Sequence, residues 1–153
     1  MNSSRSPNAG FTLTELMIVV SIAGILAIVA VPSFTSLSQS QRVKNASFEL
    51  YASLTLARSE AIKLNTNVTV TPTDAADWSQ GWTTTSTAGT IKSQAALKGV
   101  NISSGPASVV YARTGRATAA ASFQIDSSPA NTEISRCITL GLSGMPNTKR
   151  GAC

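Results

Sequence analysis

The most prominent feature of the hydrophobic pattern is an apolar run over residues 11–31, FTLTELMIVVSIAGILAIVAV, in which Glu15 is the only charged residue. A helix of about 20 apolar residues is long enough to cross the ~30 Å hydrocarbon core of a bilayer. A carboxylate in such a helix is costly unless it has a partner. The pattern therefore predicts a transmembrane or assembly helix over residues 11–32, with Glu15 as a functional acid. Pro32 is expected to kink or open the helix locally.

A second pattern, with the period of an amphipathic helix, covers residues 43–64. Its apolar positions step by three or four along one stripe, which Phe48, Tyr51, Leu56 and Ile62 widen: Val43, Ala46, Leu50, Leu54, Ala57, Ala61 and Leu64. Residues 65–67 (Asn-Thr-Asn) are expected to end the helix. We therefore expect residues 33–66 to form the helical spine of a globular head.

From residue 67 the pattern changes to the alternation of apolar and polar side chains that is typical of strands. Residues 88–99 are ambiguous between a loop and a short helical turn. Residues 143–153 are expected to form a tail without a strand, which would be loose unless a disulfide pins it onto the sheet. Residues 67–153 are thus predicted to form a β-sheet head, and the fold class is α+β. Short strands are predicted at residues 67–71, 78–85, 100–103, 108–112, 121–125 and 134–142.

Two tryptophans, Trp78 and Trp82, flank Gly81 within one of these strands. Paired aromatic side chains in a small sheet belong to its core in most proteins, and a glycine inside a strand marks a close backbone approach. The alternative is a platform on which carbohydrate or nucleic acid bases stack.

The composition removes several kinds of chemistry. The chain has no His, so His-based acid–base catalysis, Ser-His-Asp triads and His metal sites are excluded. Its two Cys cannot form a Cys-only zinc site. Beyond these exclusions, we expect no enzymatic activity, no cofactor, no metal site and no small-molecule substrate.

The positive charge is concentrated in the C-terminal part of the chain. Residues 92–153 hold seven Lys and Arg against two Asp and Glu, while the whole chain has a formal charge of +5. Such asymmetry is found in nucleic-acid-binding proteins, but it also serves solubility. If DNA is bound, the candidate side chains are Arg113, Arg116, Arg136, Lys149 and Arg150.

The junction at the start of the apolar run resembles the processing site of type IV pilins and type II secretion pseudopilins. Residues 10–16, GFTLTEL, match the pattern G-F-T-L-x-E-L of that family. The resemblance implies that residues 1–10 are a prepilin leader, that prepilin peptidase cuts after Gly10, and that Phe11 becomes the methylated N-terminus. It also implies that Glu15 pairs with the N-terminal amine of a neighbouring subunit. Without the resemblance, the segment is interpreted as an ordinary signal anchor.

Further segments are similar to the GspH/FimT/FimU branch of this family. Residues 54–62, LTLARSEAI, fit its pattern L-x-x-A-R-S-E-A-I, and residues 78–82, WSQGW, fit W-x-x-G-W. Gly115-Arg116, followed by Phe123, fits a third pattern. The resemblance implies a pilin-like fold, in which a long N-terminal helix packs against a small, mainly antiparallel β-sheet head.

The two cysteines, Cys137 and Cys153, can form only one disulfide. A leader that exports the head would place them in an oxidising compartment, and a bridge closing a loop of this size is worth roughly 3 kcal/mol. The resemblance implies the same bridge, because pilins have a C-terminal region bounded by a disulfide. The alternative is a free, reactive Cys153.

The resemblance implies a structural subunit and not an enzyme. The favoured interpretation is a FimU-like minor pilin of a type IV pilus, which takes part in assembly priming or in the tip complex. The alternatives are a FimT-like minor pilin that binds DNA for uptake in natural transformation, and a GspH-like pseudopilin of type II secretion. FimT-like members bind DNA with a C-terminal G-R-x-R motif, whereas residues 143–150 are SGMPNTKR.

The implied partners are prepilin peptidase, other major and minor pilins, the inner membrane before assembly and, in the second interpretation, DNA. The implied location is the bacterial inner membrane, with a single span and the head in the periplasm. After assembly, the subunit would lie in an extracellular pilus or a periplasmic pseudopilus.

Overall fold

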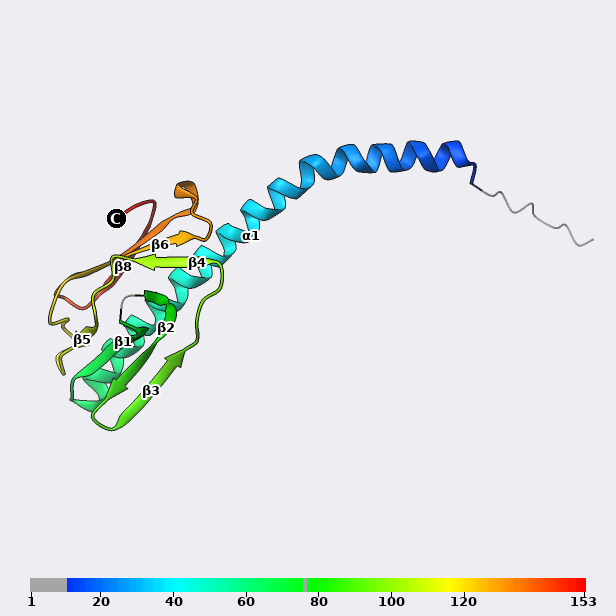
Figure 1. The fold of residues 1–153 in the computed structure, drawn as a ribbon. Coiled ribbons are helices and arrows are strands. Elements are labelled where there is room, and N and C mark those ends of the chain that lie inside the picture. The colour runs from blue at the N-terminus through cyan, green and yellow to red at the C-terminus, as the bar shows by residue number, and fades with distance from the viewer. Residues whose placement is uncertain (1–10, 76) are drawn as a thin grey trace, which may run out of the picture. The chain divides into compact units, whose positions relative to one another are not determined.

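A computed structural model describes residues 11–75 and 77–153, with the backbone alone for residues 29–33 and 132. The helix α1 (Leu13–Leu64) precedes the strands of the head (Figure 1). The chain divides into two compact units, Met1–Leu37 and Ser38–Cys153, which are considered separately. The predicted leader, including Gly10, lies outside the described residues.

In the first unit, α1 begins with a reciprocal cap. The backbone N–H and the hydroxyl of Thr12 donate to Glu15 Oε2 at 2.9 and 2.8 Å, and the backbone N–H of Glu15 donates to Thr12 Oγ1 at 3.2 Å. This Thr-x-x-Glu arrangement is a capping box, which satisfies N–H groups that the first helical turn leaves unpaired. The helical assignment of α1 continues through Pro32, so the helix is not opened there. Over the part of the chain that the structure describes, no helix is both long and apolar enough to cross a membrane.

In the second unit, the predicted apolar stripe of α1 is confirmed from Val43 to Ala61. Leu64 is 41 % exposed, because the helix ends there and Asn65 turns the chain with a φ of 50°. Phe48 and Ile62 do not widen the stripe, since they are 68 % and 50 % exposed. At 3.6 residues per turn, Phe48 lies about 160° around the helix from the buried Leu50, which explains its exposure.

The head contains two four-stranded antiparallel sheets, where the sequence suggested one. Together with α1, these sheets confirm the α+β fold class. A 3-10 turn, η1 (Thr132–Ile134), precedes β7 (Arg136–Leu140). The first sheet has the order β3-β2-β1-β5, formed by Gly89–Gln94, Asp77–Ser86, Val68–Asp74 and Val109–Tyr111. The second has the order β4-β6-β7-β8, formed by Val100–Ser103, Ala121–Ser127, Arg136–Leu140 and Pro146–Arg150.

Two of these strands correct the expectations from the sequence. β3 lies within the segment expected to be a loop or a helical turn, and β8 lies within the tail, where the sequence predicted no strand. β8 pairs with β7 from Arg136↔Arg150 to Leu140↔Pro146. Its sequence, PNTKR, has no apolar alternation, so its strand conformation depends on a neighbouring strand that local pattern does not reveal.

The core between α1 and the sheets contains both tryptophans. Trp78 is 2 % and Trp82 is 1 % exposed, so their assignment to the core is confirmed and the stacking platform is wrong. The Trp78 indole donates to the Pro106 carbonyl at 2.8 Å and meets the Phe123 ring edge to face at 4.9 Å. The close approach predicted at Gly81 is also confirmed, since its φ is +92° and a Cβ there would overlap the backbone of β3.

Candidate functional site

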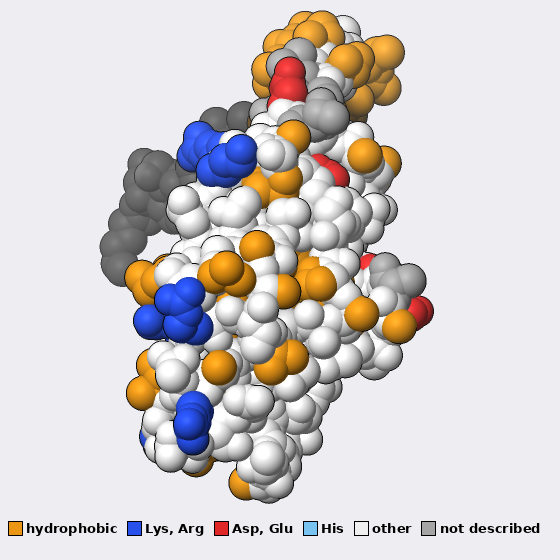
Figure 2. Space-filling model, turned by 90° about the vertical axis from the view of Figure 1, so that its left-hand side faces the viewer, with side chains coloured by type: hydrophobic (Ala, Val, Ile, Leu, Met, Phe, Trp, Pro, Cys, Tyr) orange, Lys and Arg blue, Asp and Glu red, His pale blue; other side chains and the backbone are white. Residues whose placement is uncertain are grey.

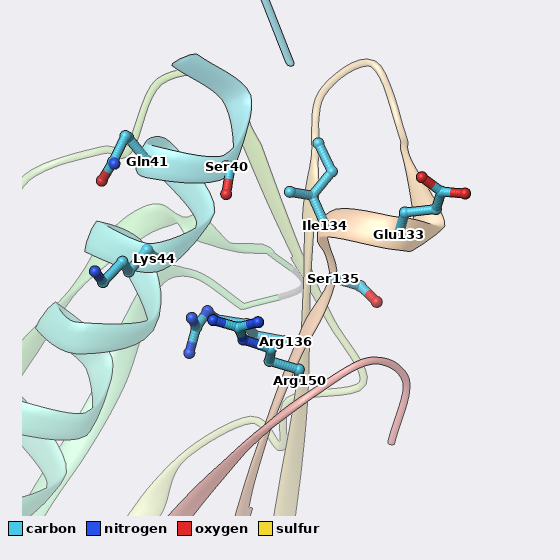
Figure 3. A pocket seen from close by; sticks show the side chains of 8 residues that line it. All are labelled: Ser40, Gln41, Lys44, Glu133, Ile134, Ser135, Arg136 and Arg150. Atoms are coloured by element: carbon cyan, nitrogen blue, oxygen red, sulfur yellow. The ribbon is translucent and has the colours of Figure 1, made fainter. Parts of the chain in front are cut away.

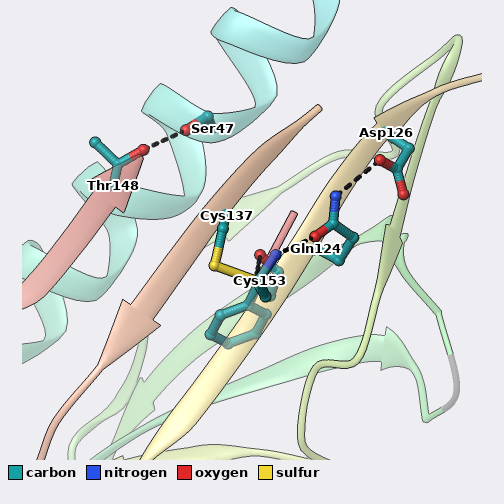
Figure 4. Close-up of a disulfide and its surroundings, with 7 residues drawn as sticks. Ser47, Gln124, Asp126, Cys137, Thr148 and Cys153 are labelled. Atoms are coloured by element: carbon teal, nitrogen blue, oxygen red, sulfur yellow. Dashed lines mark hydrogen bonds between the residues drawn. A yellow bond between two sulfur atoms is a disulfide. The ribbon is translucent and has the colours of Figure 1, made fainter. Parts of the chain in front are cut away.

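The Cys137–Cys153 disulfide forms, with the two Cα atoms 5.0 Å apart, so the alternative of a free Cys153 is wrong. The backbone N–H of Cys153 also donates to Gln124 Oε1 at 2.8 Å, and the Gln124 amide donates to Asp126 Oδ1 at 2.8 Å (Figure 4). These bonds fasten the C-terminus to β6 and β7. The disulfide thereby holds β8 beside β7.

Alternation along β7 and β8 sorts their side chains onto two faces of the sheet. Thr148 faces α1, because its hydroxyl lies 3.2 Å from that of Ser47. Arg150, two residues further along β8, shares this face, and its register partner Arg136 lies beside it. Lys149 pairs with Cys137 on the opposite face. The structure therefore separates the adjacent residues Lys149 and Arg150, which the sequence grouped together.

Arg136 and Arg150 line a pocket between α1 and the end of the second sheet. It has a volume of about 220 Å³ and is lined by Ser40, Gln41 and Lys44 of α1, by Glu133–Arg136 and by Arg150. Figure 3 shows the two arginine side chains next to each other on the side of the sheet that faces α1, and the Glu133 carboxylate pointing away from them. We call this the Lys44–Arg136–Arg150 pocket.

Of the five candidate DNA-binding residues, the structure brings only Arg136 and Arg150 together in this pocket. Arg113 and Arg116 lie in the turn after β5, exposed and outside the pocket lining. Figure 2 shows Lys and Arg side chains in separate groups on the face that it presents, divided by uncharged side chains. The positive charge on that face is therefore distributed and does not form one continuous stripe.

Sequence reasoning missed Lys44 as part of the site. Lys44 belongs to the polar side of α1, and only the packing of β7 and β8 beside this turn of the helix reveals its neighbours. Among the described residues, ion pairs join Lys63 to Glu60 at 3.2 Å and Lys92 to Glu49 at 3.5 Å. Neither of these pairs neutralises a cation of the pocket.

Arg58, from the ARSEAI segment, has a structural contact. Its Nε donates to the Gly115 carbonyl at 3.0 Å and so joins α1 to the turn after β5. Burial raises the pKa of the nearby Tyr111 phenol above its ordinary value, while the Arg58 charge acts in the opposite direction. Over the described part of the chain, no group of three or more His, Cys, Asp and Glu could hold a metal ion.

A long helix that begins with a Thr-x-x-Glu cap and continues into the spine of a disulfide-closed β-sheet head defines a pilin-like protein. The family profile described as "Type II transport protein GspH" matches residues 46–144, about two thirds of the chain. The chain therefore belongs to the GspH family of type IV pilin-like proteins, whose members are structural subunits. A second profile, "Prokaryotic N-terminal methylation motif", matches residues 5–31 and indicates a membrane-anchored pilin that is processed at its N-terminus.

Solved structures have a similar fold, and a curated relative matches part of the chain. The crystal structure of the type IV minor pilin FimU of Pseudomonas aeruginosa has a TM-score of 0.65 and 18 % identity, covering 74 % of this chain and 92 % of that one. A second crystal form gives 0.61 and 19 %, covering 69 % and 91 %. The type IV major pilin protein PilA of Myxococcus xanthus is 46 % identical over 52 residues, which is 34 % of this chain. The match spans 24 % of that pilin's length.

Proposed function

We propose that this chain is a FimU-like minor pilin of a type IV pilus, which takes part in assembly priming or in the tip complex. The observation that carries the proposal is the likeness of the fold to FimU over 92 % of that chain. The methylation motif over residues 5–31 adds support, since it is the N-terminal signal of a processed pilin.

In this proposal, residues 1–10 are the leader, prepilin peptidase cuts after Gly10, and Phe11 is methylated. Residues 11–32 anchor the subunit in the inner membrane, residues 33–66 form the spine, and residues 67–153 form the periplasmic head. The anchor is argued from the apolar sequence of residues 11–31 and from the methylation motif. The filament would be built with other major and minor pilins.

Glu15 has a defined role in this proposal. In the isolated subunit its carboxylate accepts both hydrogen bonds from Thr12. On assembly, the N-terminal amine of a neighbouring subunit would supply an opposite charge, which offsets the cost of a carboxylate in an apolar surrounding. Glu15 would then fix how far each subunit advances along its neighbour.

The test is the processing and location of the protein in its native host. We expect mass spectrometry of sheared pili to find a chain that starts at methylated Phe11, at a small fraction of the abundance of the major pilin. A Gly10→Val variant should stay unprocessed in the inner membrane, because the peptidase requires a small residue before the cut. Mature methylated protein from Gly10→Val would refute the cleavage site, and absence of the wild-type chain from sheared pili would refute the minor-pilin function.

A second candidate is a DNA-binding minor pilin for uptake in natural transformation, favoured by the seven basic residues after position 91. Contacts to phosphates alone give micromolar or weaker affinity that falls steeply with salt. We therefore expect the protein to bind a short duplex weakly at low salt and to release it at moderate salt. Tight binding that survives moderate salt and is lost in a Lys149→Ala/Arg150→Ala variant would make DNA uptake the preferred function.

A third candidate is a pseudopilin of type II secretion, since the matching family profile carries that description. The phenotype of a gene deletion distinguishes the pseudopilin function from the pilus functions. Loss of protein secretion with intact pili would support the pseudopilin, whereas loss of pili with normal secretion would support the minor pilin.

A further inference from the structure

We propose that the Lys44–Arg136–Arg150 pocket binds a phosphate group, either free or carried by a larger ligand. This inference does not depend on the pilus function, because it rests on the geometry of the second unit alone. The pocket lies wholly within that unit, between the first turns of its helix and the β7–β8 edge of its second sheet.

The first argument is charge. The pocket gathers Lys44, Arg136 and Arg150 against the single carboxylate of Glu133, which gives a formal charge of +2. Free phosphate or a phosphate monoester carries roughly −1.5 to −2 at pH 7, so it balances this charge better than a carboxylate, a chloride ion or a phosphodiester would.

The second argument is the register of the two arginines. Arg136 and Arg150 are direct cross-strand partners, and like charges placed opposite each other destabilise a sheet. The ion pairs made by Lys63 and Lys92 lie elsewhere and do not offset this repulsion. A bound anion between the two guanidinium groups would convert the repulsion into two favourable contacts, which accounts for the placement of both arginines on one face.

The third argument is shape and rigidity. A guanidinium group is a planar fork of donors that matches two oxygens of a phosphate. Both arginines belong to paired strands. The Gly151 N–H donates to the Ser135 carbonyl at 2.9 Å, which fixes the end of β8. The lining also offers the Ser40 hydroxyl, which points toward the arginines in Figure 3. A volume of about 220 Å³ is smaller than the ~300–1,000 Å³ of sites for drug-sized ligands, so it suits a small anion with water.

The test is calorimetric titration of the full-length protein in detergent with inorganic phosphate, at pH 7.5 and constant ionic strength. We expect saturable binding by the wild type and a dissociation constant about tenfold higher for Arg150→Ala and for Lys44→Ala, because each removes one charge-assisted contact. Lys149→Ala is the matched control, since it removes the same charge one residue away on the opposite face of β8. It should bind phosphate like the wild type.

Three results would overturn the proposal. The first is that the folded wild type does not bind phosphate, and the second is that Lys149→Ala and Arg150→Ala lose phosphate affinity equally. The third is that acetate or chloride binds as strongly as phosphate. Unchanged near-ultraviolet circular dichroism from Trp78 and Trp82 would show that each variant is folded, since both residues lie in the core.

A competition arm identifies the source of the phosphate group. If phosphate displaces a bound fluorescent DNA duplex, and Arg150→Ala lowers the affinity for the duplex more than Lys149→Ala does, the phosphate group belongs to a DNA strand. Phosphate binding without such competition would assign the pocket to free phosphate or a small phosphate ester. Both results support a phosphate site. If distributed surface charge held the duplex instead, the two variants would lower its affinity equally.

Discussion

Gly144 joins the loop between β7 and β8 to the turn after β5. Its φ is +79°, and a Cβ at this position would overlap the carbonyl of Gly115. The same carbonyl accepts the hydrogen bond from Arg58 of α1. The Gly115 carbonyl therefore accepts a hydrogen bond from the helix and also lies against Gly144 of the β7–β8 loop, so a side chain at residue 144 would overlap it.

We predict that Gly144→Ala lowers the free energy of unfolding of the head by about 2 kcal/mol or more. The left-handed backbone alone costs an alanine roughly 1–2 kcal/mol, and the overlap with Gly115 adds to it. Gly151→Ala is the control, because Gly151 has a φ of +88° and a Cβ added there would have no neighbour within 4 Å. Thermal unfolding should show the larger loss in Gly144→Ala; equal losses would contradict the close approach.

Asp77 stabilises the start of β2 through its charge. Its Oδ1 accepts from the Ser79 hydroxyl at 2.5 Å and from the backbone N–H of Ser79 at 2.8 Å, and the hydroxyl is the main cause of the lowered pKa of the carboxyl. Because the folded pKa lies below the unfolded one, this stability is present above the unfolded value and is lost as pH falls through the folded value.

We therefore predict that Asp77→Asn is less stable than the wild type at pH 7, by no more than about 1 kcal/mol since the group is partly exposed. The difference should shrink as the pH falls below about 4, the ordinary range for Asp. Unfolding midpoints measured from pH 7 to pH 3 test this. A difference that stays constant with pH would show that the carboxyl acts by shape alone.

At the scale of elements, the C-terminal half of α1 stabilises the head with one face only. We predict that Leu54→Ala lowers the free energy of unfolding by about 2–5 kcal/mol, because Leu54 is completely buried and the change leaves a cavity. Phe48→Ala removes a larger side chain from the exposed face and should have little effect on the same scale. A comparable loss in both variants would contradict the observed orientation of the helix.

The disulfide is the second feature that stabilises the head. We predict that Cys153→Ser lowers the stability of the head by about 3 kcal/mol, because a bridge across a separation of 16 residues no longer restricts the unfolded chain. Hydrogen exchange should increase mainly in β8, which the bridge holds against β7. Reducing agent should destabilise the wild type and leave Cys153→Ser unchanged; an equal response of both would contradict the account.

The sequence was sufficient for elements with a strong periodicity of their own. The stripe from Val43 to Ala61 specifies the buried face of α1, and the Trp78–Trp82 pair specifies the core. β3 and β8 could not be predicted, because their strand conformation comes from pairing and not from alternation of their own residues. Lys44 could not be placed in the pocket for the same reason: its neighbours Arg136 and Arg150 are distant in sequence and meet it only through the β7–β8 pairing.

At the scale of the whole molecule, the two proposed functions are separated along the chain. The N-terminal segment carries the methylation motif and Glu15, while the head carries the disulfide and the Lys44–Arg136–Arg150 pocket. Changes in the head that preserve folding should therefore leave processing intact. Changes at Glu15 should leave the head folded and act on assembly alone.

A Glu15→Leu variant shows whether the protein functions as an assembled pilin subunit. The measurement is the amount of mature protein in sheared pili relative to the inner membrane, compared with the wild type and with Arg113→Ala as a charge-removing control in the head. We expect Glu15→Leu to be inserted, cleaved and methylated normally but to be nearly absent from pili, whereas Arg113→Ala is incorporated. Incorporation of Glu15→Leu at the wild-type level would refute the assembly role of Glu15.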